Sequence, residues 1–255
     1  MNTLERFSLQ GKTAIVTGAA GLLGRYHCKA LAEAGAAVVA TDLEQAACES
    51  VAHEFGQGAL AYAADVTDPV SLRRLVDAVL ERTGHIDILV NNAAVNDRFE
   101  SPSVALERSQ FENYPLERWK LSLDVNVTGV FLCSQIIGAR MAARGHGSII
   151  NIGSTYGLVA PDQSLYRDRH GQQRFYKSAV YPATKGAVLA FSRYLAAYWA
   201  PRGVRVNALS PGGVENAQAD DFIAEYSRPT PLGRMAVPED YMGRSSFSPP
   251  MPRPI

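Results

Sequence analysis

Cysteine is scarce in this chain of 255 residues, with three in all: Cys28, Cys48 and Cys133. None stands in a CxxC or other metal-ligand spacing, which argues against a disulfide framework and against a bound metal. We expect three small core residues in a reducing compartment. Neither sign of charge is in surplus, because 25 lysines and arginines balance 25 aspartates and glutamates. A neutral chain is not expected to bind nucleic acid or an anionic membrane surface.

No signal-peptide pattern opens the chain, and no apolar run is long enough to cross a bilayer. We therefore expect a cytoplasmic protein without a membrane partner. Internal repeats are also missing. Hydrophobic residues make up 47% of the chain, which suits one globular α/β domain with a sizeable core.

The most informative stretch runs from Lys12 to Asp42, where a strand, a glycine-spaced turn, a helix and a second strand follow one another. We expect them at residues 13–16, at Gly18, Gly21 and Gly24, at residues 23–34 and at residues 38–41. Glycines let the backbone approach a pyrophosphate closely, and the helix N-terminus offers that anion unpaired N–H groups. The pattern is typical of a βαβ dinucleotide-binding unit.

Asp42 stands at the tip of the second predicted strand, where its carboxylate can accept hydrogen bonds from an adenosine ribose. The same carboxylate would repel a 2′-phosphate, so the sequence favours NAD over NADP as the cofactor. Arg25, inside the glycine turn, weakens that inference a little.

Strands and helices continue to alternate along the chain, which predicts a parallel sheet covered by helices on both faces. Further strands are expected at residues 59–63, 86–90, 148–152 and 204–209, and helices at residues 44–55, 69–83, 116–143 and 181–199. Two long irregular segments, 96–115 and 159–180, are expected near a binding site. A short lid helix is expected within residues 217–226.

Tyr181 and Lys185 are four residues apart, a spacing that puts both side chains on one face of a helix. A nearby ammonium favours the phenolate of a tyrosine, so Tyr181 is a candidate general acid and base near neutral pH. Ser154 follows a predicted strand and can hydrogen-bond a substrate carbonyl or hydroxyl. In an open parallel sheet, ligands bind at that edge.

With these residues the chain resembles the short-chain dehydrogenase/reductase family along residues 7 to about 243. The matching positions are Thr17-Gly18, Gly24, Asp42, Asp65-Val66, Asn91-Asn92-Ala93-Ala94, Asn126, Ser154, Tyr181, Lys185 and Pro211-Gly212. The resemblance implies a Rossmann-type doubly wound parallel β-sheet in a three-layer αβα arrangement. It also implies an NAD(P)-dependent oxidoreductase that assembles as a homodimer or homotetramer.

By this resemblance, Asn126, Ser154, Tyr181 and Lys185 form a catalytic tetrad. Tyr181 exchanges the proton with the substrate, and Ser154 orients the reacting oxygen. Lys185 binds the nicotinamide ribose and lowers the tyrosine pKa, and Asn126 holds a water of the proton relay. The implied cofactor-binding residues are Gly18, Gly21, Leu23, Gly24, Asp42, Asp65, Val66, Asn92, Ala93, Ala94, Tyr181, Lys185, Pro211, Gly212 and Val214.

The chain departs from the family pattern at several places. Leu22 stands where a glycine is usual, and the resulting GxxGxxG spacing looks like the branch that modifies sugar nucleotides. Glu215-Asn216 replace the usual threonine after the Pro-Gly motif. The segment between Ser154 and Tyr181 is about twice the usual length and is rich in basic residues. We expect its part 165–177 to border a substrate pocket, with Tyr156, Arg167, Arg169 and Arg174 as candidate contacts to a polar or anionic substrate.

The last twelve residues, RSSFSPPMPRPI, are the fourth departure, because the family continues there with a helix and a final strand. Four prolines exclude both elements, so the sheet is expected to lack its usual last strand. One added G in front of a permitted codon choice would encode AVVFLASDASAY, the pattern typical of the family. We therefore interpret residues 1–243 as the dinucleotide-binding domain and residues 244–255 as a frame-shifted remnant, with a natural Pro-rich tail as the alternative.

These features together predict an NAD-dependent oxidoreductase that interconverts a secondary alcohol and a ketone on a polar, sugar-derived small molecule. An epimerase or dehydratase of a nucleotide sugar with tightly bound NAD is one alternative, and net NADH formation would separate the two. A non-catalytic NAD-binding regulatory protein is another, which a steady-state assay would decide.

Overall fold

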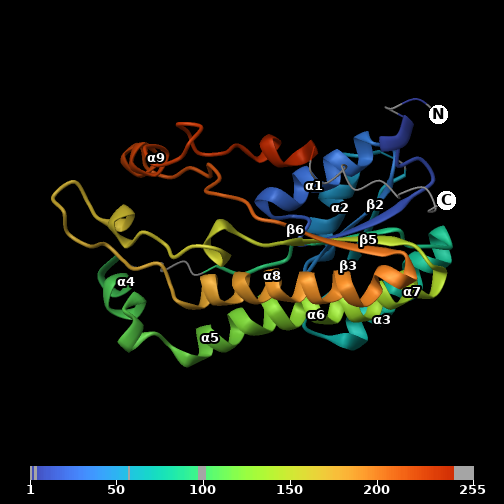
Figure 1. Cartoon of the computed structure of the whole chain (residues 1–255), viewed down its shortest axis with the longest axis horizontal. Coiled ribbons are helices and arrows are strands. Elements are labelled where there is room, and N and C mark those ends of the chain that lie inside the picture. Colours follow the sequence, from blue (N-terminus) through green and yellow to red (C-terminus); the bar gives the residue numbers. More distant parts are fainter. Residues whose placement is uncertain (1, 3–4, 57, 97–101, 244–255) are drawn as a thin grey trace.

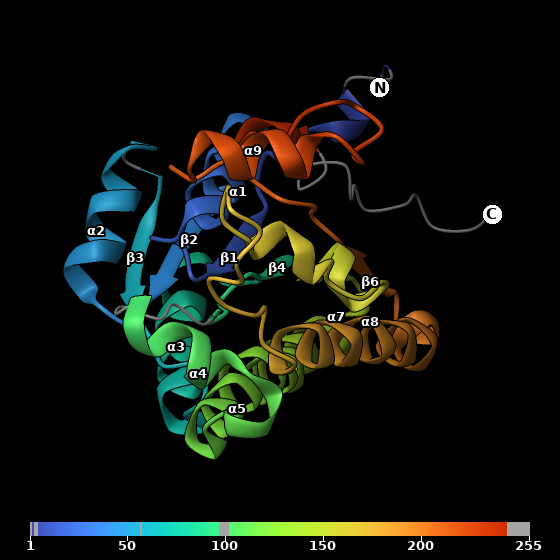
Figure 2. The same cartoon turned by 90° about the vertical axis from the view of Figure 1, so that its left-hand side faces the viewer.

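The computed structural model describes residues 2, 5–56, 58–96 and 102–243. Six strands form one parallel sheet in the order β3-β2-β1-β4-β5-β6, with helices on both faces (Figures 1 and 2). This arrangement confirms the predicted doubly wound, Rossmann-type α/β fold. The strands are β1 (Thr13–Thr17), β2 (Ala37–Asp42), β3 (Leu60–Ala63), β4 (Ile88–Asn91), β5 (Gly147–Ile152) and β6 (Val204–Leu209).

The two faces of the sheet have separate hydrophobic cores. In β1, Ile15 packs into the core on one face, whereas Ala14 and Val16 pack into the core on the other. Because both faces are buried, β1 carries consecutive apolar residues at Ala14, Ile15 and Val16 instead of apolar residues at alternate positions only. Helices α1 (Leu22–Glu33) and α2 (Gln45–His53) cover one face, and α3 (Pro69–Thr83), α5 (Leu116–Leu123), α6 (Gly129–Cys133), α7 (Ala139–Arg144) and α8 (Val180–Trp199) cover the other.

Helix α3 shows how local signals set the element bounds. Its N-cap, Asp68, accepts hydrogen bonds from the backbone N–H groups of Val70 and Ser71 at 2.8 and 3.2 Å. Pro69 occupies the first turn, where a missing N–H costs nothing. Gly84 ends the helix with φ 75°, in the left-handed region. The helix therefore has the bounds that the sequence predicted.

One long helical segment runs from Leu116 to Arg144 and contains α5, α6 and α7. Two π-helical segments, Asp124–Thr128 and Ser134–Gly138, join these three helices. By length and composition this segment could cross a membrane, so the expectation that no apolar run is long enough was wrong. Its apolar residues have another use, because Cys133, Ile137 and Met141 are buried in the core against the sheet.

The polar segment 96–115 is less irregular than expected. It contains helix α4 (Pro102–Ser109) and a 3-10 turn at Phe111–Asn113, whereas residues 97–101 lie outside the described part. The second long segment, 159–180, is irregular as predicted, with one 3-10 turn at Gln163–Tyr166. We call residues 159–179 the insertion. Helix α9 (Asp220–Ser227) lies where the short lid helix was predicted.

The sheet described here ends at β6, which pairs with β5 alone within the described residues. Val204 and Val206 are buried, whereas Asn207 and Ala208 at the same strand are exposed. The tail that was interpreted as a frame-shifted remnant, residues 244–255, lies outside the described residues.

Candidate active site

A cavity of about 810 Å³ lies along the carboxyl ends of the parallel strands. Its lining comes from the turn after β1, the ends of β2, β4 and β5, helix α8, the insertion, and the segment after β6. This edge of an open parallel sheet is where such folds bind their ligands. Sixteen of the sequence-predicted site residues line it: Gly18, Gly21, Leu23, Asp42, Asp65, Val66, Asn92, Ala93, Ala94, Ser154, Tyr156, Tyr181, Lys185, Pro211, Gly212 and Val214.

The glycine turn after β1 is held by hydrogen bonds from Asn92, at the end of β4, and by close backbone packing between Gly18 and Gly24. Asn92 donates from Nδ2 to the carbonyls of Thr17 and Gly18 at 3.0 and 2.9 Å. A Cβ on Gly24 would lie 2.0 Å from the Gly18 carbonyl oxygen, which no side chain tolerates. Gly24 does not line the cavity; it allows α1 to start close behind the turn. The first turn of α1 thus faces the cavity and fits a pyrophosphate.

Asp42 lies at the far end of this cavity, on the tip of β2. Its carboxylate accepts hydrogen bonds from the backbone N–H of Ala20 at 3.0 Å and of Leu43 at 2.9 Å. Arg25, which the sequence placed in the turn as a competitor, forms an exposed ion pair with Glu54 at 2.8 Å and does not line the cavity. The charged side chains that line this end of the cavity thus include Asp42 and Asp65 and do not include Arg25.

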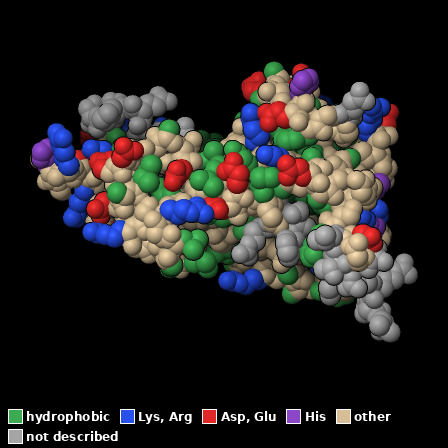
Figure 3. All heavy atoms as spheres, turned by 90° about the horizontal axis from the view of Figure 1, so that it is seen from above, with side chains coloured by type: hydrophobic (Ala, Val, Ile, Leu, Met, Phe, Trp, Pro, Cys, Tyr) green, Lys and Arg blue, Asp and Glu red, His purple; other side chains and the backbone are tan. Residues whose placement is uncertain are grey.

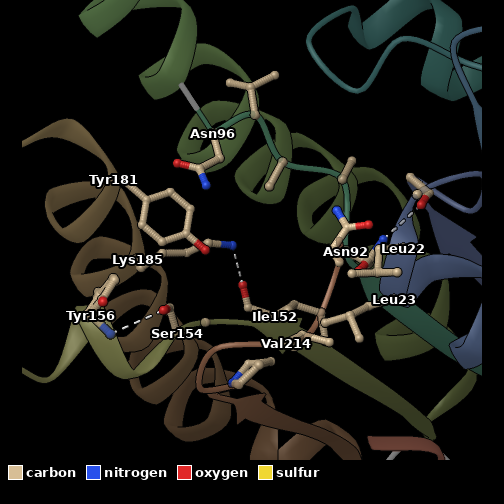
Figure 4. A pocket seen from close by; sticks show the side chains of 18 of the residues that line it. Leu22, Leu23, Asn92, Asn96, Ile152, Ser154, Tyr156, Tyr181, Lys185 and Val214 are labelled. Carbon is tan, nitrogen blue, oxygen red and sulfur yellow. Dashed lines mark hydrogen bonds between the residues drawn. The ribbon is translucent and has the colours of Figure 1, made fainter. Parts of the chain in front are cut away.

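Tyr181, Lys185 and Ser154 lie together at the middle of the cavity (Figure 4). The Ser154 hydroxyl accepts a hydrogen bond from the Tyr156 N–H at 3.1 Å. Lys185 Nζ donates to the carbonyl of Ile152 at 2.7 Å and lies 5.7 Å from the centroid of the Tyr181 ring. Helix α8 supplies the tyrosine and the lysine on one face, as their spacing predicted.

Burial is the largest influence on the pKa values of both Lys185 and Tyr181. It lowers the pKa of Lys185 to about 8, because a charged ammonium loses its hydration inside the protein. Burial also raises the pKa of Tyr181, and the hydrogen bond with Ser154 offsets only part of that increase. The expectation that Lys185 lowers the tyrosine pKa stays a prediction, because Lys185 is not among the influences on the pKa of Tyr181 in this structure.

Asn126 does not line the cavity but holds two segments that do, the one after β4 and the start of helix α8. It lies in the first π-helical segment, is buried, and does not line the cavity. Its side chain accepts from the N–H of Val95 at 2.7 Å and donates to the Val95 carbonyl at 2.9 Å. It also donates to Thr184 Oγ1 at 3.3 Å. Asn126 thus ties the segment after β4 to helix α8.

The opposite end of the cavity from Asp42 is built by the insertion and by α9. Tyr166 is buried and packs on Phe175 and Phe222, with ring centroids 4.8 and 5.8 Å apart. Its hydroxyl lies 3.4 Å from that of Tyr156. Lining residues here that the sequence did not single out as site residues are Asn96, Tyr166, Lys177, Asn216, Gln218, Phe222 and Tyr226. The segments 96–115 and 159–180, which were expected near a binding site, contain Asn96, Tyr166 and Lys177, and the predicted lid helix contains Gln218, Phe222 and Tyr226.

The three arginines expected to contact substrate do not line the cavity. Arg167 and Arg169 are exposed and bond to Gln173 and His170, their neighbours in the insertion. Arg174 is exposed and faces Asp221 of α9 at 3.9 Å. Figure 3 shows basic side chains at the end of the molecule that the insertion forms. The expected arginine contacts are thus corrected, because long exposed side chains at the loop tip remain in water.

The loop after β6 is held by two tyrosines. Gly212 N–H donates to the hydroxyl of Tyr241 at 3.1 Å, and Gly213 N–H donates to the hydroxyl of Tyr226 at 2.6 Å. A Cβ on Gly213 would lie 2.5 Å from the Tyr226 ring, so α9 sits directly on this loop. Among the described residues, no cluster of three or more His, Cys, Asp or Glu side chains is placed to hold a metal ion.

Comparison with known proteins places this geometry in a large group of enzymes. A family model described as enoyl-(acyl carrier protein) reductase matches residues 18–247. D-threitol dehydrogenase of Mycolicibacterium smegmatis is 34% identical over 249 residues, 94% of this chain and 86% of that protein. Galactitol 2-dehydrogenase (L-tagatose-forming) of Cereibacter sphaeroides is 34% identical over 251 residues, 94% of this chain and 89% of that protein.

A solved structure with the same fold is a gluconate 5-dehydrogenase from Burkholderia cenocepacia in complex with NADP and tartrate. It is 31% identical, with a TM-score of 0.83 over 98% of this chain and 92% of that chain. The likeness in fold therefore extends over nearly the whole chain.

Proposed function

The chain belongs to the short-chain dehydrogenase/reductase family of NAD(P)-dependent oxidoreductases acting on CH–OH groups, and we propose that it oxidises a polyhydroxylated, sugar-derived secondary alcohol to the ketone with NAD. The observation that carries the proposal is the shared cavity. Tyr181, Ser154 and Lys185 lie in the same cavity as the glycine turn. The fit of a dinucleotide rests on that turn, because Gly18, Gly21 and the first turn of α1 at Leu22 and Leu23 line the cavity.

The residues then divide the chemistry between them. When bound, the cofactor supplies the hydride acceptor. Tyr181, in the phenolate form that a neighbouring ammonium favours, accepts the hydroxyl proton of the alcohol, and Ser154 holds the reacting oxygen beside the tyrosine. Lys185 keeps an ammonium beside Tyr181, held by the Ile152 carbonyl. The alcohol thus loses a hydride and a proton and becomes a ketone; the reverse transfer reduces it.

The preference for NAD over NADP rests on Asp42. Its carboxylate is already held by the N–H of Ala20 in the glycine turn, and Arg25 is paired with Glu54. Placing a 2′-phosphate against a fixed carboxylate costs several kcal/mol, so we expect kcat/KM for NAD to exceed that for NADP on the order of 100-fold. Equal or higher kcat/KM with NADP would overturn this assignment.

A polyhydroxylated substrate is supported by the polar lining at the insertion end and by relatives named for threitol and galactitol. The test is to incubate the protein with NAD and a panel of alditols, aldonates and nucleotide sugars while NADH is followed by absorbance. Stoichiometric NADH and ketone from a panel member are expected. Conversion of a nucleotide sugar without net NADH would favour the epimerase or dehydratase alternative.

Homo-oligomeric assembly also remains a proposal. It is supported by exposed aromatic side chains on two adjacent helices, Phe131 on α6 and Tyr194 and Tyr198 on α8. Light scattering of the purified chain tests it; a strictly monomeric mass at micromolar concentration would refute it.

A further inference from the structure

Two tyrosine hydroxyls lie close together at the insertion end of the cavity. The hydroxyl of Tyr156 lies 3.4 Å from that of Tyr166, and both residues line the cavity. Because a good O–H···O hydrogen bond is about 2.7–2.8 Å long, this contact is a weak one. Within the described part of the chain, neither hydroxyl makes another hydrogen bond. The pair therefore keeps hydrogen-bonding capacity that a ligand in the cavity can use.

Tyr156 places this pair next to the candidate reacting centre. Its backbone N–H donates to the Ser154 hydroxyl at 3.1 Å, and Figure 4 shows the two residues side by side near Tyr181. The reacting hydroxyl of the proposed substrate lies at Ser154 and Tyr181. The groups that this substrate carries on neighbouring carbons therefore lie in the same part of the cavity as the two phenols.

The ring of Tyr166 is held in place from two sides. It is buried and packs on Phe175 of the insertion and on Phe222 of α9, with ring centroids 4.8 and 5.8 Å apart. Its backbone carbonyl also accepts a hydrogen bond from the Arg174 N–H at 2.9 Å. A hydroxyl fixed in this way is pre-organised, so that less entropy is lost when a ligand binds to it.

Both hydroxyls keep their protons near neutral pH. Burial is the main cause that raises the pKa of Tyr156 and of Tyr166 above the ordinary value of a tyrosine. The carboxylate of Asp162 acts in the same direction on both phenols. Two protonated phenols side by side offer a donor and an acceptor to one ligand group. A hydroxyl matches them, because it is itself both a donor and an acceptor.

We propose that Tyr156 and Tyr166 form a specificity site for a second hydroxyl of the substrate, which makes the enzyme select polyhydroxylated alcohols over simple secondary alcohols. This inference rests on the proposed function. The second hydroxyl donates to one phenol and accepts from the other, and these two hydrogen bonds replace the long contact between the phenols. Since Tyr166 belongs to the insertion, this unusually long segment takes part in the choice of substrate.

A structural role and a role in proton transfer are the competing explanations, and they predict different results. A structural role of Tyr166 rests on its ring, which packs on Phe175 and Phe222. Removal of the hydroxyl alone would then leave the kinetics unchanged. A role in proton transfer would lower kcat for every alcohol and shift the pH profile of kcat. Recognition of a second hydroxyl distinguishes a polyol from a simple alcohol.

The experiment compares polyols with simple alcohols of the same chain length: threitol with 2-butanol, and sorbitol and galactitol with 2-hexanol. Steady-state kinetics with NAD are measured for the wild type, Tyr156→Phe and Tyr166→Phe. The wild type should prefer the polyols in kcat/KM by at least about 10-fold. Each variant should raise KM for the polyols about 3- to 10-fold with kcat changed less, the effect of one neutral hydrogen bond. For the simple alcohols, kcat/KM should change less than about 2-fold.

Tyr176→Phe is the matched control, since it removes the hydroxyl of a tyrosine of the insertion that does not line the cavity. Circular dichroism confirms that each variant folds, and Tyr156→Phe carries the test alone if Tyr166→Phe does not. An unchanged KM for the polyols, an equal loss for polyols and simple alcohols, or a shifted pH profile of kcat would overturn the proposal.

A binding arm separates this inference from the proposed function. Calorimetry measures the binding of threitol, sorbitol and galactitol to the enzyme–NADH complex, whether or not turnover occurs. Polyol binding that Tyr156→Phe and Tyr166→Phe weaken, without NADH formation in the assay, would leave the inference standing and refute the proposed function. Polyol binding that both variants leave unchanged, or no polyol binding at all, would refute the inference even if a polyol is oxidised.

Discussion

Replacing Lys185 with methionine should make the protein more stable at neutral pH while it removes activity. Lys185 is only 4% exposed, and burial lowers its pKa from the ordinary 10.5 to about 8. By linkage, this difference corresponds to roughly 3 kcal/mol by which the fold disfavours the charged ammonium. Methionine has similar length and no charge, so the variant escapes that penalty.

The sign of the effect follows from the two pKa values. Between about pH 8 and pH 10.5 the unfolded chain still binds the proton that the folded chain has released, so stability rises with pH in that window. Below pH 8 both states are protonated and the full penalty is present. Above pH 10.5 both are neutral and the penalty is gone.

Part of the stability that Lys185→Met gains by removing the buried charge is offset by a lost hydrogen bond. Lys185→Met removes the donor that Nζ offers to the Ile152 carbonyl, at a cost of about 1 kcal/mol or somewhat more. The net expectation is a gain of about 1–2 kcal/mol at pH 7 and a small loss at pH 10.5. For a chain of this size, each kcal/mol corresponds to roughly 2–4 °C in melting temperature.

Urea unfolding without cofactor at pH 7 and at pH 10 is the assay, with turnover measured in parallel. Lys29→Met serves as the control, because that exposed side chain should change stability by less than about 0.5 kcal/mol. The reasoning is refuted if Lys185→Met is less stable than the wild type at pH 7, or if the difference between the two is the same at both pH values.

Three further outcomes are expected. Tyr181→Phe should lower kcat about 10²–10⁴-fold with little change in NAD affinity by fluorescence titration, and retention of most activity would move the proton transfer elsewhere. Asp42→Asn should reduce the NAD/NADP ratio of kcat/KM at least about 10-fold by removing the charge that accepts from Ala20; an unchanged ratio would exclude Asp42 as the selector. Gly24→Ala should abolish NAD binding in the same titration, because its Cβ would meet the Gly18 carbonyl oxygen at 2.0 Å, and normal binding would contradict the described turn.

Much of the fold could be predicted because its signals are short-range. The glycine turn, strand periodicity and the Asp68-Pro69 start with Gly84 as the stop act within a few residues, and α3 formed with the predicted bounds. Helix α4 escaped prediction because its eight residues lie in a polar stretch where no periodic pattern has room to emerge.

The residues of the candidate site likewise include some that the sequence could predict and some that it could not. Tyr181 and Lys185 were predictable because the helix period alone brings residues four apart onto one face. Arginines 167, 169 and 174 looked equally suited to bind an anion, yet they lie at the exposed tip, whereas Lys177 reaches the cavity. Composition cannot separate these four basic residues, because it does not say which way a loop folds back.

The sequence alone thus determined the dinucleotide unit, the parallel sheet and the residue types of the proton-transfer group, since each depends on backbone geometry over one or two elements. Tertiary structure decided the direction of the Tyr181 pKa, because burial depends on everything packed around the ring. It also brought Lys177 to Asn96, 81 residues away in the chain. Contacts over such separations depend on how the insertion, α8 and the strand ends pack together, and no local pattern of residues specifies that packing.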